Sequence, residues 1–100
     1  MATLVSTLNG FRGLGSTDQE HTDLAKEFLD AAEEHLETHA ALANASCLQK
    51  FNSIRTIHAL MVMAETHASA GRAYAMYQKR LKAAKDKQEK YVNDFRNGCL

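Results

Sequence analysis

The stretch from His67 to Met76, which reads HASAGRAYAM, decides how the last third of this chain folds. It contains Gly71 but no proline, asparagine or aspartate that would mark a loop. A single glycine weakens a helix by about 1 kcal/mol relative to alanine and does not by itself reverse a chain. We therefore favour a helix that continues through Gly71, straight or kinked, over a third helix that folds back.

The sequence around this stretch predicts an all-α protein. One hundred residues, 45% hydrophobic and 24% charged, are typical of one globular domain. The chain has no proline and five glycines, which favours long helices, and no stretch alternates apolar and polar residues as a strand would. The expected architecture is an antiparallel helical hairpin with a long C-terminal helix, or a three-helix bundle if the chain reverses near Gly71.

Local signals place the expected helix ends. Thr17 and Glu20 have the spacing of a capping box, which starts a helix. Asn44 to Ser46 forms the best interior break, and Ser46 can cap the helix that follows. The expected elements are a flexible arm over 1–15 and, within a single helical domain over 16–97, helices over about 17–43, 46–70 and 72–96.

The first two expected helices differ in character. The first is amphipathic, with an acidic outer side. The second is apolar on most sides, which is typical of a helix that lies centrally in a bundle or between subunits. Its apolar residues are Leu48, Phe51, Ile54, Ile57, Leu60, Met61, Val62 and Met63.

Charge is divided between the two halves of the chain. Met1–Leu48 holds eight acidic and two basic residues, a net charge of −6, and Gln49–Leu100 holds ten basic and four acidic residues, a net charge of +6. We favour an acidic helix that packs beside a basic one within the fold. The alternative is that one charged pole faces an outside partner.

The two cysteines predict no metal or lipid site. Cys47 and Cys99 form no CxxC pair, and Cys99 lies too close to the end for a prenylation box. We expect Cys47, which lies among apolar residues, to be a small buried hydrophobe. The chain shows neither a secretion signal nor an apolar run of about 20 residues, so we expect a soluble, intracellular protein.

Beyond Gly71, apolar residues recur at alternating spacings of three and four, as in a heptad seam. If the helix continues, this seam has no neighbour in its own chain and requires another copy or another protein. We therefore expect a small protein–protein interaction module, acting as an assembly subunit, adaptor or inhibitor and associating with itself. The expected interface residues are Ile57, Leu60, Met63, Tyr74, Tyr77, Leu81, Tyr91 and Phe95.

A nucleic-acid-binding protein is the first alternative, because basic residues follow one another along the last helix and can neutralise phosphates. Three acidic residues interrupt the run, and no helix-turn-helix or zinc-finger spacing is present. The candidate residues are Lys79, Arg80, Lys82, Lys85, Lys87 and Lys90.

A metal-binding bundle is the second alternative. His35 and His39 lie one helical turn apart, and LETHA at Leu36–Ala40 returns as AETHA at Ala64–Ala68. Histidines of this spacing can hold zinc or iron. In a hairpin, however, Ala31 lies level with the third candidate ligand, His58, so the histidines do not converge.

Buried-side histidines can also make association sensitive to pH. The glycines form no phosphate-binding loop and no Gly-x-Ser-x-Gly turn occurs, so we expect neither a cofactor nor an enzymatic activity.

Overall fold

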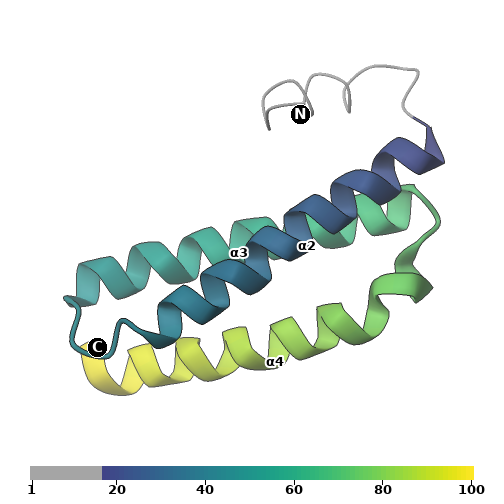
Figure 1. Cartoon of the computed structure of the whole chain (residues 1–100). Coiled ribbons are helices and arrows are strands. Elements are labelled where there is room, and N and C mark those ends of the chain that lie inside the picture. Colours follow the sequence, from purple (N-terminus) through teal and green to yellow (C-terminus); the bar gives the residue numbers. More distant parts are fainter. Residues whose placement is uncertain (1–16) are drawn as a thin grey trace.

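The computed structural model describes residues 17–100, which form three helices and no strand. They are α2 (Asp18–Ala40), α3 (Cys47–Ala70) and α4 (Tyr74–Cys99). Each helix runs antiparallel to the one before it, and α4 lies along both α3 and α2 (Figure 1). The all-α prediction is confirmed, and of the two expected arrangements the three-helix bundle is the one that forms. The favoured continuous helix is wrong, and the predicted arm over 1–15 lies outside the described residues.

Both predicted capping signals are confirmed. The Thr17 side chain accepts a hydrogen bond from the Glu20 backbone N–H, and the Glu20 carboxylate accepts one from the Thr17 backbone N–H. Ser46 and Gln49 make the same reciprocal pair at the start of α3. Each box satisfies backbone donors that a helix start leaves open, so α2 and α3 begin where local chemistry places them.

The chain reverses at Arg72 rather than at the glycine beside it. Arg72 has a φ of +58°, in the left-handed region that non-glycine residues rarely adopt, whereas Gly71 has a φ of −87°. The Ala73 N–H donates to the Ala68 carbonyl at 2.8 Å, which satisfies an open acceptor at the end of α3. Because an arginine carries the unusual conformation, the sequence does not mark this turn.

Gly71 is needed here because the turn lies directly against α2. A Cβ atom at Gly71 would lie 2.7 Å from the Asp18 carbonyl oxygen and 2.9 Å from the Thr22 backbone nitrogen. Neither backbone atom can move unless helix α2 moves with it. The glycine therefore allows the α3–α4 turn to pack on the first turn of α2.

We expect Gly71→Ala to lower the free energy of unfolding by about 1–3 kcal/mol, because α2 must shift to make room. Gly98→Ala is the matched control, since nothing lies within 4 Å of a Cβ added there. Urea unfolding followed by circular dichroism measures both variants. Equal stabilities for the two variants would show that the turn does not pack on α2.

One apolar core runs between the three helices. Leu29, Ile57 and Leu81 are its largest fully buried apolar side chains, one from each helix. Alanines between them permit close approach of the helix backbones. The other core residues are Ala25, Phe28, Ala32 and Leu36 from α2, Met61, Ala64 and Ala68 from α3, Ala73 before α4, and Tyr77 and Ala84 from α4.

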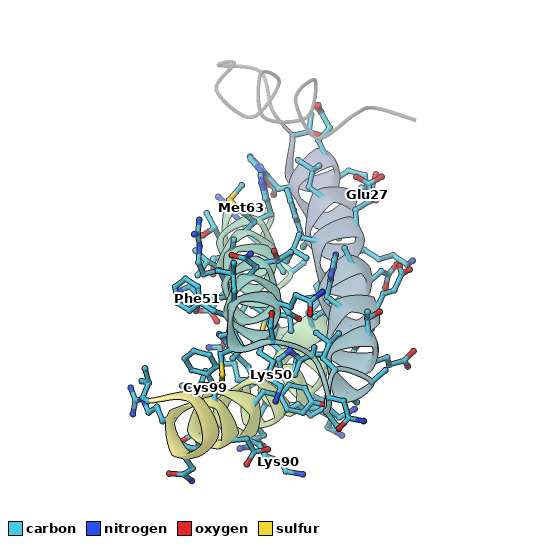
Figure 2. All side chains as sticks on the ribbon, turned by 90° about the vertical axis from the view of Figure 1, so that its left-hand side faces the viewer. Glu27, Lys50, Phe51, Met63, Lys90 and Cys99 are labelled. Carbon is cyan, nitrogen blue, oxygen red and sulfur yellow. A yellow bond between two sulfur atoms is a disulfide. The ribbon has the colours of Figure 1, made fainter. Side chains whose placement is uncertain are left out.

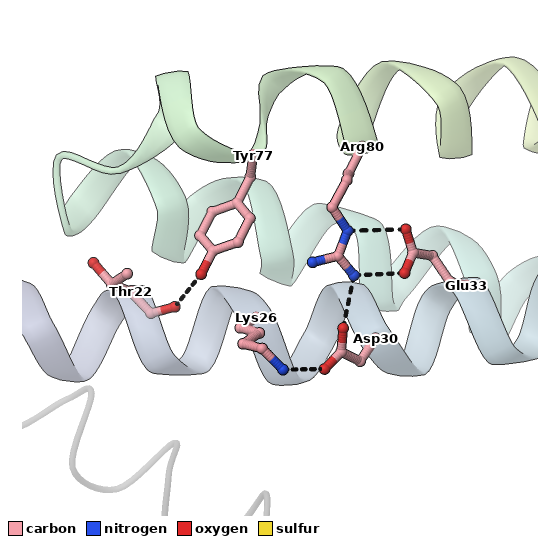
Figure 3. Close-up of polar contacts among 6 residues, drawn as sticks. All are labelled: Thr22, Lys26, Asp30, Glu33, Tyr77 and Arg80. Atoms are coloured by element: carbon pink, nitrogen blue, oxygen red, sulfur yellow. Dashed lines mark hydrogen bonds and ion pairs between the residues drawn. The ribbon is translucent and has the colours of Figure 1, made fainter.

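The basic helix packs beside the acidic one, as the charge division predicted. Arg80 donates from Nε and Nη2 to the two carboxylate oxygens of Glu33, at 3.1 and 2.5 Å, and from Nη2 to Asp30 at 2.7 Å (Figure 3). Lys26 donates to the same Asp30 at 2.8 Å. Hydrogen bonds from Lys26 and then Arg80 hold the pKa of Asp30 below its usual value. These contacts fix α4 against α2.

A disulfide joins Cys47, the first residue of α3, to Cys99, the last residue of α4, with 5.7 Å between their Cα atoms (Figure 2). The prediction that Cys47 is a small buried hydrophobe is wrong, because the residue is exposed and covalently paired. The pairing could not be foreseen from a continuous helix, in which the two cysteines lie far apart. Disulfides persist mainly in oxidising compartments, which weighs against the intracellular location expected from the sequence.

Across residues 17–100, none of the helices combines the length and the apolar composition needed to cross a membrane.

Candidate functional site

The outer face of α3 carries exposed apolar side chains in a helical spacing. Leu48, Phe51 and Val62 are 69%, 43% and 48% exposed, although α3 already buries Ile57 and Met61 on its opposite side. Phe51 projects from α3 away from α2 (Figure 2). We name this surface the α3 outer face, and its residues are Leu48, Phe51, Asn52, Arg55, Ala59 and Val62.

An open groove of about 640 Å³ continues this face toward α4. Ile54 and Ala59 from α3 and Val92 from α4 give it apolar walls. His58 and Gln88 cross it with a hydrogen bond of 3.0 Å between the imidazole Nδ1 and the amide nitrogen. The groove therefore offers apolar contact together with one polar bridge.

Aromatic contacts support the edge of the α3 outer face. The Phe51 ring lies against the Phe95 ring of α4, with centroids 6.0 Å apart, and the Arg55 guanidinium lies 5.8 Å from the Phe51 centroid. Arg55 covers part of the ring, and its charge stays near the surface. An aromatic side chain held in this way loses little conformational entropy when a partner docks.

Three of the eight interface residues predicted from the sequence lie in the core. Ile57, Tyr77 and Leu81 are buried, and the Tyr77 hydroxyl donates to the Thr22 carbonyl of α2 at 3.4 Å (Figure 3). These residues cannot meet a partner because α4 folds back and α2 covers them. The remaining predicted interface residues lie at edges: Leu60, Met63 and Tyr91 pack partly on the core, Phe95 is half-buried and Tyr74 is exposed.

Leu48, Phe51 and Val62 were not among the predicted interface residues. The signal for them was present, because the second helix is apolar on most sides and one side must stay uncovered in a three-helix bundle.

The predicted basic row does not form one continuous basic surface. Arg80 is bound to α2, Lys85 forms an ion pair with Glu65 of α3, and Lys82 pairs with Asp86 at 3.5 Å. The remaining three candidates, Lys79, Lys87 and Lys90, are exposed. Half of the row is thus partly neutralised within the chain, which weakens the case for phosphate binding.

Histidines join α2 to α3 near both ends of their interface. His21 and His67 face each other, with 3.1 Å between their Nδ1 atoms, and the His67 ring stacks on the Phe28 ring at a centroid distance of 5.5 Å. His67 is fully buried. Burial first, and the neighbouring His21 second, lower the pKa of His67.

The second histidine contact lies toward the other end of α2. His39 Nδ1 lies 2.8 Å from the Ser53 hydroxyl of α3, and the His39 ring lies 4.5 Å from the Tyr91 ring of α4. Burial lowers the pKa of His39, and the Lys50 ammonium lowers it further, whereas Asp94 acts in the opposite direction.

The three histidines considered as metal ligands do not meet. His35 is exposed on α2, His39 contacts Ser53, and His58 contacts Gln88 on the other side of α3. Within the described part of the chain, no group of three histidine, cysteine or carboxylate residues could hold a metal ion.

No protein-family model, no curated protein and no solved structure matches this chain.

Proposed function

We propose that this protein is a helical interaction module that pairs with a second copy of itself through the α3 outer face. The observation that carries the proposal is the row of exposed apolar side chains, Leu48, Phe51 and Val62, on a helix that already buries its opposite side. Large apolar side chains that stay exposed on one face of a helix can mark an interaction site. The role fits an assembly subunit, an adaptor or an inhibitor.

The net charges of the three helices favour a second copy of this chain as the partner that binds the α3 outer face. In a two-fold symmetric contact each surface meets itself, so a charged surface repels its own copy. Helix α2 holds eight acidic residues and one basic residue, a net charge of −7, and α4 holds seven basic and three acidic residues, a net charge of +4. Helix α3 holds two basic residues and one acidic residue, a net charge of +1. Of the three helices, α3 can therefore approach its own copy with the least repulsion.

The size of the α3 outer face predicts weak pairing. Leu48 and Val62 lie 14 positions apart, which corresponds to about 21 Å along the helix. Stable interfaces bury about 800 Å² on each partner, more than one short helical stripe supplies. Dimers should therefore form and separate as concentration changes.

We expect the protein to shift from monomer toward dimer between about 10 μM and about 1 mM, a range typical of weak interfaces. Val62→Glu, and separately Phe51→Glu, should weaken pairing at least about tenfold, because each substitution places two carboxylates in an otherwise apolar contact. Sedimentation equilibrium measures the change, and circular dichroism verifies that the helices are intact.

Met76→Glu is the matched control, because Met76 is 69% exposed but lies on α4 outside the α3 outer face. Pairing that survives Val62→Glu and weakens in salt would instead indicate contact between the acidic α2 of one copy and the basic α4 of another. A protein that stays monomeric at the highest concentration contradicts the proposal.

A further inference from the structure

Helix α2, which the histidine contacts attach to α3, also has the fewest covalent links to the rest of the bundle. The turn at Gly71–Ala73 joins α3 to α4 at one end, and the disulfide between Cys47 and Cys99 joins them at the other. Helix α2 is connected to this closed pair only through the loop before Ser46, within the described part of the chain. Of the three helices, α2 is therefore the one that can leave while the other two stay together.

The contact between His21 and His67 limits how many protons this end of the interface can take up. One of the facing Nδ1 atoms must donate and the other must accept. A doubly protonated imidazole donates from both nitrogens and cannot accept. The pair can hold one extra proton, but a second would place two N–H groups and two positive charges face to face in a buried site.

The charged groups that the structure describes near the first histidine contact lie at the surface. Near His67, Asp18 of α2 and Arg72 of the turn are exposed and pair with each other at 3.9 Å, and the Tyr77 hydroxyl of α4 is directed to a backbone carbonyl. His21 acts against protonation of His67.

At the other end, Lys50 of α3 opposes protonation of His39 and Asp94 of α4 favours it, and burial outweighs both. Ser53 of α3 and Tyr91 of α4 are the uncharged contacts of His39. Both ends of the α2–α3 interface thus resist added positive charge.

We propose that mild acid releases α2 from the bundle, because His67 and His39 gain protons in buried contacts that disfavour a positive charge, while α3 and α4 remain joined by the turn and the disulfide. Release uncovers apolar side chains on both sides of the interface, including Leu29 and Ile57. The inference concerns the α2–α3 interface and stands independently of pairing through the α3 outer face.

The pH window follows from the direction of the shifts. The folded pKa values of His67 and His39 lie below the ordinary value of 6.5, so both residues are neutral in the folded state near pH 7. The neutral histidines therefore stabilise the packing of α2 fully above about pH 6.5, where unfolded histidines also lose their protons. This stabilisation falls as the pH drops below 6.5, and it reaches its minimum once the pH lies below the folded pKa values.

Amide hydrogen exchange read by NMR at pH 7.5 and pH 5.0, corrected for intrinsic rates, tests the inference on the oxidised protein. Protection of the buried amides of α2 should fall about tenfold or more, because protonation of the two histidines weakens the packing of α2 on α3. Protection at the centres of α3 and α4 should fall less. Equal loss in all three helices, or no loss in α2, would overturn the inference.

Variants separate the histidine contacts from general acid effects. His67→Gln together with His39→Gln should remove most of the difference between the two pH values, because glutamine does not titrate. His35→Gln is the matched control, since His35 is exposed on the same helix.

If the double variant does not fold, a ¹³C NMR titration of the wild-type histidine rings decides the question directly. Midpoints below 6.5 for His67 and His39, accompanied by loss of α2 protection over the same pH range, support release. Midpoints at or above 6.5 would overturn it.

Discussion

Replacing Leu81 by alanine should lower the free energy of unfolding by about 2–5 kcal/mol, the range for large-to-small changes in a core. Leu81 is 1% exposed, and it lies where α4 folds back on α2 and α3. Natural domains are stable by about 5–15 kcal/mol, so the loss is a large share of the total. Guanidinium unfolding followed by circular dichroism measures it.

Met76→Ala is the control on the same helix, because Met76 is mostly exposed and its truncation should change stability by about 0.5 kcal/mol or less. The comparison separates a core residue from an interface residue. If Leu81 lay in a seam between copies, Leu81→Ala would reduce association at high concentration and leave the dilute protein as stable as the wild type.

Removing the disulfide with Cys47→Ser and Cys99→Ser together should lower the free energy of unfolding by about 4 kcal/mol. The bond closes a loop with a sequence separation of 52, and the chain-entropy model gives about that value for a loop of this length. The effect comes chiefly from the unfolded state, which becomes free to expand. Thermal unfolding and urea unfolding both report it.

Reduction of the wild-type protein provides an independent route to the same state. Wild-type protein treated with a phosphine reductant should unfold at the same urea concentration as the double serine variant, and the reductant should not change the variant. A double variant as stable as the oxidised wild type would show that the two cysteines do not constrain the fold.

Side-chain caps made the first residues of α2 and α3 predictable from the sequence. Thr17 with Glu20, and Ser46 with Gln49, satisfy helix-start donors through contacts three residues apart, which a sequence shows directly. The register of these two helices was also predictable to within about one helical turn. Ala31 level with His58 places His21 beside residue 68 and His39 beside residue 50, and the structure pairs them with His67 and Ser53.

The reversal between α3 and α4 was not predictable in the same way. It depends on a left-handed Arg72 and on a contact between Gly71 and Asp18, 53 positions earlier in the chain. Tertiary packing supplies the stabilisation, and no local residue preference marks it. Three of the predicted interface residues, Ile57, Tyr77 and Leu81, are buried for this reason, because the seam of α4 finds its neighbour within the chain.

The exposed side of α3 could not be predicted from the sequence either. The apolar residues of α3 were recognised from the sequence, but which of them remain uncovered depends on where α2 and α4 pack. Once α4 folds back, Ile57 is enclosed while Phe51 and Val62 stay exposed. The side that is exposed is therefore a consequence of the reversal at Arg72.

Inter-ring NOEs measured by NMR test whether α4 folds back within its own chain. We expect NOEs between His39 and Tyr91, whose ring centroids are 4.5 Å apart, and between Phe51 and Phe95, at 6.0 Å. In a continuous helix the two phenylalanines would lie about 66 Å apart. A mixture of isotope-labelled and unlabelled chains separates contacts within a chain from contacts between chains. We expect both NOEs to arise within one chain. If they are absent, or arise only between chains, α4 does not fold back on its own chain.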